Sequence, residues 1–292
     1  MFLSRFSSRL STLCWLLPFI ATSAYSAPMV WLAKDSQREF IFLGSIHAGN
    51  ETLYPLPSPF LDHWKDADAL VVEANILKPA NTALKPNQPT TTQLLDHAEK
   101  EKLAQVTKQT HQSYPSLLNS PPWLAAIQLQ MDMAKQVGLT PEQGIDITLL
   151  QRANEERRPI LELESIQQQI EMMESFDDHG KDLLMTTVND WGEMQTQLSC
   201  LVDAWKAGDH QQLLSLFEDS QYSDDTDDTL IFERNHKWAS LLSTSPLYQQ
   251  GRFIVVVGAL HLFGEQGVPA LLEQQGFEVS LLTQGERSNC RL

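Results

Sequence analysis

Two short segments near opposite ends of the chain share one pattern, in which an apolar run ends at a glycine and a histidine follows three residues later. One is FIVVVGALHLFGEQG, with Gly258 and His261, and the other is EFIFLGSIHAG, with Gly44 and His47. Such a run is typical of a buried strand, and the glycine lets the backbone turn tightly so that the histidine lies just past the strand end. Ligands bind at such strand ends in open α/β sheets. We therefore expect His47 and His261 to face one another in a single site.

The predicted elements indicate an α/β protein with some α+β character, in which a central mixed β-sheet is flanked by many helices. Apolar runs on both sides of the polar turn KDSQ favour an opening β-hairpin. If the strands at 253–258 and 277–282 are neighbours, the helix between them implies a parallel pair with a right-handed crossover. Further strands are expected at 69–74 and 159–163. Helices are expected from 58, at 94–107 and 123–137, from just after Pro141 to the Arg157-Arg158-Pro159 segment, and over most of 166–245.

The first 26 residues have the features of a secretory signal peptide. Two arginines precede an apolar stretch, and Ala24 and Ser26 offer small residues for cleavage before Ala27. The apolar core is far shorter than the about 20 residues that a membrane span needs, and no later segment approaches that length. We expect a secreted or periplasmic protein with no membrane span in its mature chain. Residues 27–292 are then one domain, with a largely helical insertion at about 166–245.

Export leaves a strongly acidic chain. Removal of residues 1–26 takes away two arginines and no acid, which leaves 19 basic and 37 acidic residues and a formal charge of −18. A field of this sign repels nucleic acids and anionic lipids, and no basic stripe offsets it. Nucleic acid is therefore excluded as a partner.

The cysteines leave two alternatives open. Cys14 lies within the predicted signal peptide, so Cys200 and Cys290 remain as an even pair in an oxidising compartment. They either form a disulfide that ties the C-terminal tail to a helix or stay as free thiols. A CxxC motif is absent, which argues against a cysteine-based metal or redox site.

Acidic residues follow two of the predicted strands, as the histidines do. Glu73 ends the run ALVVEA and Glu164 follows PILEL. Two histidines with one or two carboxylates suffice for a divalent ion with an open position for water or substrate. Water on such an ion has a lowered pKa and becomes a nucleophile at neutral pH. One glutamate can then be a ligand and the other the general base.

These residue types also allow a purely structural reading. A histidine near a strand end is often only a hydrogen-bonded structural residue, and Glu73 or Glu164 alone can be a surface acid or a partner of Arg234. The other mature-chain histidines lie in predicted helices or loops and are left out of the site: His63, His97, His111, His179, His210 and His236. HExxH, GxSxG, P-loop and GxGxxG motifs are absent, which removes the commonest zinc-peptidase, serine-hydrolase and nucleotide-binding readings.

The segment before the last strands combines an acidic stretch with an amphipathic helix. Residues 218–228 contain six acids and are expected to form a solvated loop, because the ligand spacing and central glycine of a calcium loop are missing. The helix that follows carries Arg234 and Trp238, which are four residues apart and share a face.

Six short motifs, in this order, resemble those of the TraB/GumN family, whose relatives include the Tiki-type extracellular metalloproteases. They are Gly44-Ser45-Ile46-His47 with Tyr54-Pro55-Leu56-Pro57; Val72-Glu73; Gly144-Ile145-Asp146-x-x-Leu149; Pro159-Ile160-x-x-Leu163-Glu164-Ser165-x-x-x-Gln169; Arg234-Asn235-x-x-Trp238; and Val257-Gly258-x-x-His261-Leu262-x-Gly264-x-x-Gly267-Val268. The resemblance covers nearly the whole mature chain. Two positions depart from it, since Ala74-Asn75 follow Glu73 where many members carry a further acid, and Arg158 replaces the usual lysine.

The resemblance implies an α/β fold with a mixed sheet and a site built from both Gly-x-x-His motifs. It makes His47, His261 and Glu73 the expected metal ligands, and Glu73, Glu164, Arg234 and Asn235 the expected catalytic residues. For Tiki-type relatives it implies Mn²⁺- or Co²⁺-dependent peptide cleavage, and Zn²⁺ also suits such ligands.

We therefore expect a metal-dependent hydrolase, more specifically a metallopeptidase with a peptide or protein substrate. The alternatives are a metal-free esterase-like hydrolase with a histidine base and a glutamate partner, and a non-catalytic protein that binds haem or a peptide.

Overall fold

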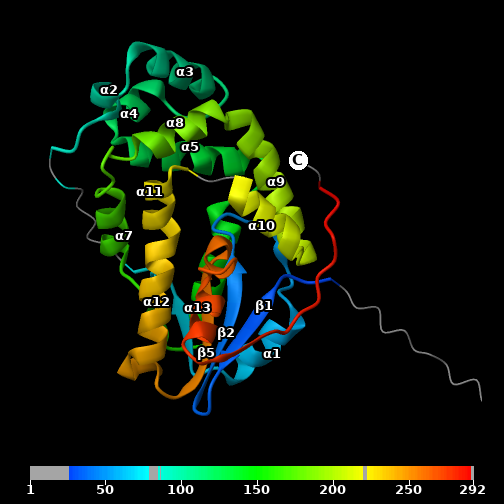
Figure 1. Cartoon of the computed structure of the whole chain (residues 1–292). Helices are drawn as coiled ribbons and strands as arrows, with labels where there is room; N and C mark the ends of the chain where they lie inside the picture. The colour runs from blue at the N-terminus through cyan, green and yellow to red at the C-terminus, as the bar shows by residue number, and fades with distance from the viewer. Residues whose placement is uncertain (1–25, 79–84, 86, 220–221, 291–292) are drawn as a thin grey trace, which may run out of the picture.

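The computed structural model describes residues 26–78, 85, 87–219 and 222–290 and is built around one six-stranded sheet (Figure 1). The strands are β1 (Val30–Lys34), β2 (Arg38–Ser45), β3 (Ala69–Val72), β4 (Ile160–Glu162), β5 (Gly251–Gly258) and β6 (Glu278–Leu281). The mixed sheet with its many helices confirms the α/β class expected from the sequence. The predicted signal peptide lies outside the described residues, apart from Ser26.

Strand order across the sheet is β4-β3-β5-β2-β1-β6. Strands β4, β3, β5 and β2 are parallel, whereas β1 is antiparallel to both of its neighbours. The predicted opening hairpin is therefore confirmed as β1 and β2. The strands predicted at 253–258 and 277–282 form β5 and β6 but are not neighbours. Strands β2 and β3 flank β5, and β6 pairs with β1 at the far edge. The parallel pair inferred for them does not form.

Most of the helices fall into three groups around this sheet. One face is covered by α1 (Ser58–Asp66) and α6 (Ile145–Glu155), and the other by α12 (Glu233–Thr244) and α13 (Val268–Gln274). A helical cap gathers beyond the C-terminal ends of the parallel strands (Figure 1): α2 (Thr91–Leu94), α3 (His97–Thr107), α4 (Tyr114–Asn119), α5 (Pro122–Gln136), α8 (Lys181–Asn189) and α9 (Trp191–Ala207). The remaining helices are α7 (Ile166–Met173), α10 (His210–Asp219) and α11 (Asp224–Asp227).

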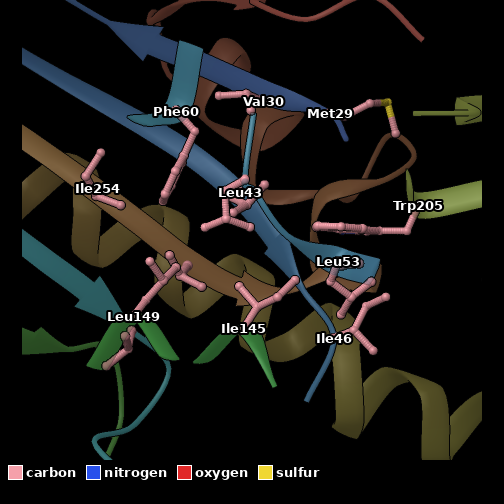
Figure 2. Close-up of a cluster of buried hydrophobic side chains, with 14 of the residues drawn as sticks. Met29, Val30, Leu43, Ile46, Leu53, Phe60, Ile145, Leu149, Trp205 and Ile254 are labelled. Carbon is pink, nitrogen blue, oxygen red and sulfur yellow. The ribbon is translucent and has the colours of Figure 1, made fainter. Parts of the chain in front are cut away.

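Alternate residues of the central strands pack into two different cores, because successive side chains of a strand point to opposite faces. Leu43 and Ile254 belong to the core that includes Phe60 of α1 (Figure 2). Their neighbours Phe42 and Val255 pack on the other face, with the helices α12 and α13. The near-continuous apolar runs of β2 and β5 follow from this burial on both faces.

The cap is fastened to the sheet next to the first Gly-x-x-His turn. Trp205, near the end of α9, donates its indole N–H to the carbonyl of Gly44 at 2.8 Å. A disulfide joins Cys200, also in α9, to Cys290 near the C-terminus. Their Cα atoms are 5.3 Å apart, which is within the usual range. The tail is thus tied to a cap helix, the first of the two alternatives left open for these cysteines.

The solvated loop expected at 218–228 is wrong at both ends of this stretch. Helix α10 extends to Asp219, and residues 224–228 form α11 and the start of a π-helical turn, η3 (Asp228–Phe232). Thr226 is buried there. The Ser223 backbone N–H and the Thr226 hydroxyl both donate to one carboxylate oxygen of Asp182, at 3.0 and 3.1 Å. A contact with a distant helix therefore orders a stretch whose composition indicates solvation.

Within the described part of the chain, none of the helices combines the length and the apolar character needed to cross a membrane.

Candidate functional site

The two Gly-x-x-His turns lie side by side at the C-terminal ends of β2 and β5. These strands are parallel neighbours, and their register pairs Ser45 with Gly258. His47 follows in the loop after β2, and His261 lies in η5 (Ala259–Leu262), a single 3-10 turn after β5. The sheet thus brings together two motifs from opposite ends of the chain.

The ring of His47 is held by Asp146, in the first turn of α6. Its Nδ1 lies 2.9 Å from Asp146 Oδ2, and the Ser45 hydroxyl donates to the other carboxylate oxygen at 2.7 Å. A carboxylate only accepts, so Nδ1 carries the proton in the neutral ring and Nε2 carries the lone pair. The side chain of His47 is 66% exposed. Its Nε2 is therefore open to a ligand.

A second orienting contact fixes the tautomer of His261, which is buried. The amide nitrogen of Asn235 donates to the carbonyl of Gln266 at 2.8 Å, which turns the amide oxygen toward the imidazole. That oxygen accepts from His261 Nδ1 at 2.7 Å. Because Nδ1 is the donor, the lone pair of the ring lies on Nε2. The ring also packs against Trp238, with centroids 4.5 Å apart.

The acids and the arginine predicted for the site form one buried network. Glu73 and Glu164 follow the neighbouring parallel strands β3 and β4, and Arg234 Nη2 donates to both carboxylates at 2.5 Å. Gln169 of α7 donates to the same two groups, at 2.9 Å to Glu164 and 3.3 Å to Glu73. Arg234 also lies over the Trp238 ring, 4.6 Å from its centroid. The guanidinium therefore compensates two buried negative charges.

Gly258 lies at the point where three of these side chains converge. Its N–H donates to Glu73 Oε1 at 2.7 Å. A Cβ atom built on this glycine would be 3.2 Å from that oxygen, 3.4 Å from Cδ2 of His261 and 3.6 Å from Nε2 of His47. Nε2 of His261 is itself 3.8 Å from Glu73 Oε1. One imidazole nitrogen, one carboxylate oxygen and the edge of the His261 ring thus border the space that the missing side chain leaves open.

The surroundings set different charges on the three groups. Burial lowers the pKa of His261 to about 3, so this ring is neutral at neutral pH. Burial alone would raise the pKa of Glu73, but the positive charges of Arg234 and of protonated His47, together with the Gly258 N–H, lower this pKa below its ordinary value. The negative charge of Asp146 raises the pKa of His47 to about 9. His261 and Glu73 are therefore in the forms that bind a cation, whereas His47 must first release a proton.

The donor set suits a divalent cation in its chemistry, although its spacing is wider than that of a closed site. Among the described residues, no three His, Cys, Asp or Glu side chains stand close enough to enclose an ion. Each histidine nevertheless offers Nε2 while an acceptor holds Nδ1, as is usual for metal-ligating histidines. Arg234 Nη1 lies 3.2 Å from His261 Nε2, so an ion at this nitrogen would replace that contact. An ion held by all three groups would therefore require Arg234 to leave His261 and the donors to move closer together.

Comparison with known proteins agrees with this arrangement of motifs. The pattern of the TraB/PrgY/gumN family matches residues 29–281. The chain belongs to this family. It is 35% identical over 257 residues to the "Uncharacterized protein YbaP" of Escherichia coli strain K12, covering 85% of this chain and 93% of that protein. The protein of the same name from Shigella flexneri is 34% identical over the same coverage. None of the solved structures compared with the chain matches it.

Two residues of this family member join the site without having been assigned a role from the sequence. Asp146 orients His47, and Gln169 bridges the two glutamates. Both lie in the segments that resemble the family motifs, and that was the available signal. Asp146 is 99 residues from His47 along the chain, and Gln169 is 96 residues from Glu73. Sequence spacing alone therefore could not identify these contacts.

In the metal-free protein, His47 should titrate near pH 9, and Asp146→Asn should bring its pKa back toward the ordinary 6.5. A pKa raised by folding stabilises the protein below about 6.5, and this contribution is lost as the pH rises through about 9. Solvent screens the exposed ring, so the effect on stability is small.

NMR titration of the His47 imidazole measures its pKa. Urea unfolding at pH 6 and pH 10 should show a larger loss of stability in the wild type than in D146N. An unchanged His47 pKa in D146N would contradict the assignment.

Proposed function

We propose that this protein is a metal-dependent hydrolase that cleaves peptide bonds. The observation that carries the proposal is the convergence of His47 Nε2, the His261 ring and Glu73 Oε1 on the open space at Gly258. Outer partners hold Nδ1 of both imidazoles, Nε2 of His47 is open and Nε2 of His261 faces Arg234, and a carboxylate of low pKa completes the set. The resemblance to Tiki-type metalloproteases favours Mn²⁺ or Co²⁺ as the ion, and Zn²⁺ also suits nitrogen and oxygen ligands.

His47, His261 and Glu73 would hold the ion, which when bound supplies Lewis-acid polarisation of a carbonyl and a lowered pKa for water. Asp146 and Asn235 keep the two rings in the tautomers that this requires. Neutral His261 binds without losing a proton, whereas His47 gives one up.

Glu164 and Arg234 provide the remaining chemistry in this proposal. Oε1 of Glu164 is fixed by Arg234 and Gln169, whereas Oε2 has a longer contact, 3.4 Å from Arg234 Nε. A carboxylate held through one oxygen can accept a proton from water at the other. Arg234, which faces His261 as well as both acids, is placed to stabilise negative charge that develops on the substrate oxygen.

A second candidate is a metal-free hydrolase in which His47, oriented by Asp146, acts as the base once it has released its Nε2 proton. The contact that favours it is the hydrogen bond from Arg234 to His261 Nε2, because a guanidinium already lies where an ion would bind that ring. The paired His47 and Asp146 have the base-and-orienter arrangement of hydrolases that use no metal. Hydrolysis that persists after chelation would favour this candidate.

Gly258→Ala tests the proposal because it puts a methyl group between the three donors and removes none of them. The backbone accepts alanine there, since φ is −49°. We expect Mn²⁺ affinity to fall at least about 10-fold, with a matching loss of activity. Mutating residues that support the ligands of a metal site typically has an effect of this size. Calorimetry of the chelator-stripped protein gives the affinity, and cleavage of a peptide library with and without added Mn²⁺ or Co²⁺ gives the activity.

The matched control is Gly192→Ala, which adds the same methyl group at a helix position where nothing lies within 4 Å. Its affinity and activity should equal those of the wild type, and thermal melting should show both variants folded. Metal binding unaffected by Gly258→Ala would refute the ion site. A wild-type protein that cleaves no member of the library under any condition would refute the hydrolase.

We also propose that the protein acts in the periplasm or outside the cell. The disulfide between Cys200 and Cys290 supports this, because such bonds persist in oxidising compartments. Sequencing of the N-terminus of the exported protein should find Ala27 as its first residue.

A further inference from the structure

An apolar cavity of about 300 Å³ lies directly beside the candidate site, between the strand ends and the helical cap. Its near wall comes from the two histidine turns, through Ile46, His47 and Leu260. Its far wall comes from the cap helices α5 and α9, with Met131 and Leu198 among the lining residues. The same two turns that carry the imidazoles therefore also form one end of the cavity.

The lining of this cavity is suited to an uncharged group. None of its lining residues is Asp, Glu, Lys or Arg, and three of them are methionines: Met131, Met133 and Met194. Methionine side chains are flexible and polarisable, so they adapt to apolar groups of different shape. At the polar end, Gln130 donates to the Tyr222 hydroxyl at 3.2 Å, and burial raises the pKa of Tyr222 to about 12. The cavity thus carries no charge at neutral pH other than that of His47.

His47 connects this cavity with the cluster around Gly258. His47 lines the cavity, while its Nε2 lies 3.6 Å from the Cβ position of Gly258, which Glu73 Oε1 and the edge of the His261 ring also approach. A substrate side chain that packs against the His47 ring is therefore only a few bonds, along the substrate, from the carbonyl carbon that would be attacked. The volume is at the lower end of small-molecule sites, enough for one large side chain and too small for a folded partner.

We propose that this cavity binds an apolar side chain of the substrate, such as leucine, methionine or phenylalanine, next to the bond that is cleaved. This inference rests on the proposed hydrolase function and adds the substrate class. The net negative charge of the mature chain is consistent with this substrate class, because it repels peptides with acidic residues near the cleaved bond.

Binding can be tested without turnover. The mature chain is labelled with ¹³C at its methionine methyl groups and titrated with acetyl-leucine amide or acetyl-glycine amide. The methyl signals of the three cavity methionines should shift with the leucine compound and not with the glycine compound. Met29, in the core beneath the first strand, should remain unchanged in both titrations.

Specificity is tested with a matched pair of variants. Leu198→Arg introduces a long cation into the cavity wall, and Leu247→Arg makes the same change at a position that is 65% exposed and outside the cavity. The wild type and L247R should cleave a peptide with leucine beside the bond at least about 10-fold faster, in kcat/KM, than the glycine peptide. In L198R this ratio should fall to about 1.

The outcomes separate the two proposals. If the methyl signals respond to leucine but no peptide is cleaved, the cavity binds apolar groups and the hydrolase function is wrong. If peptides are cleaved with no preference for apolar residues, or the methyl signals do not respond, the specificity proposal is overturned. The titration of the wild type decides this even if L198R does not fold.

Discussion

Replacing His261 by alanine should abolish metal-dependent hydrolysis while the protein stays folded. The ring is buried and supplies one of the two imidazole nitrogens, and its low pKa makes it the ligand that binds without losing a proton. The loss of metal affinity should exceed the roughly 10–100-fold that removing an outer partner costs. Asn235→Ala, which removes the acceptor of His261 Nδ1, should itself fall within that smaller range. Calorimetry and steady-state kinetics measure both.

The control is His97→Ala, because the His97 side chain is 91% exposed in the cap and should tolerate the change without effect. Added imidazole should restore part of the activity of H261A and none of the activity of Gly258→Ala, where the space itself is filled. Such rescue distinguishes a ligand from a residue that only supports the fold. H261A that binds Mn²⁺ as tightly as the wild type would end the metal proposal.

Replacing Arg234 by methionine should destabilise the protein by about 3–5 kcal/mol, the cost of leaving buried charges without their partner. Arg234 donates to both Glu73 and Glu164, and all three side chains are between 10% and 12% exposed. Methionine preserves much of the packing against Trp238 but leaves two carboxylates without this cation. Urea unfolding at pH 7 measures the difference in the free energy of unfolding.

Arg252→Met gives the comparison, since Arg252 pairs with Glu39 at 3.2 Å but is 54% exposed. Its loss should cost no more than about 1 kcal/mol, as for other exposed ion pairs. Adding Glu73→Gln to R234M should recover part of the lost stability, because one of the stranded charges is removed. An R234M protein as stable as R252M would show that the buried network does not stabilise the fold.

Much of the site could be predicted from the sequence, because its residues follow strands. The apolar runs before Gly44 and Gly258 are long and uninterrupted, and the acids Glu73 and Glu164 end two more runs. Parallel strands present their C-terminal ends at one edge of the sheet, so residues at these positions lie together in space. The structure places both histidines, both acids, Arg234 and Asn235 in one cluster at that edge.

The partners of these residues could not be predicted in the same way. Asp146 reaches His47 across 99 residues and Arg234 reaches Glu73 across 161, and such contacts depend on how helices pack on the sheet. The place of the last strand beside β1, and the helical order of the acidic stretch, were also set by tertiary contacts. Local periodicity describes how an element folds and carries no information about which distant element covers it.

By itself, the sequence determined the strands and the residue types that follow them, because these depend on apolar periodicity. The tight turn expected at Gly44 is wrong, since this glycine lies inside β2, and neither Gly44 nor Gly258 has a positive φ. Only the tertiary structure decided which nitrogen of each histidine carries the lone pair, which cation neutralises the two acids and where the apolar cavity lies. Hydrogen bonding and burial across the sheet edge control all three. Those contacts exist only once the cap and α12 have packed against the strands.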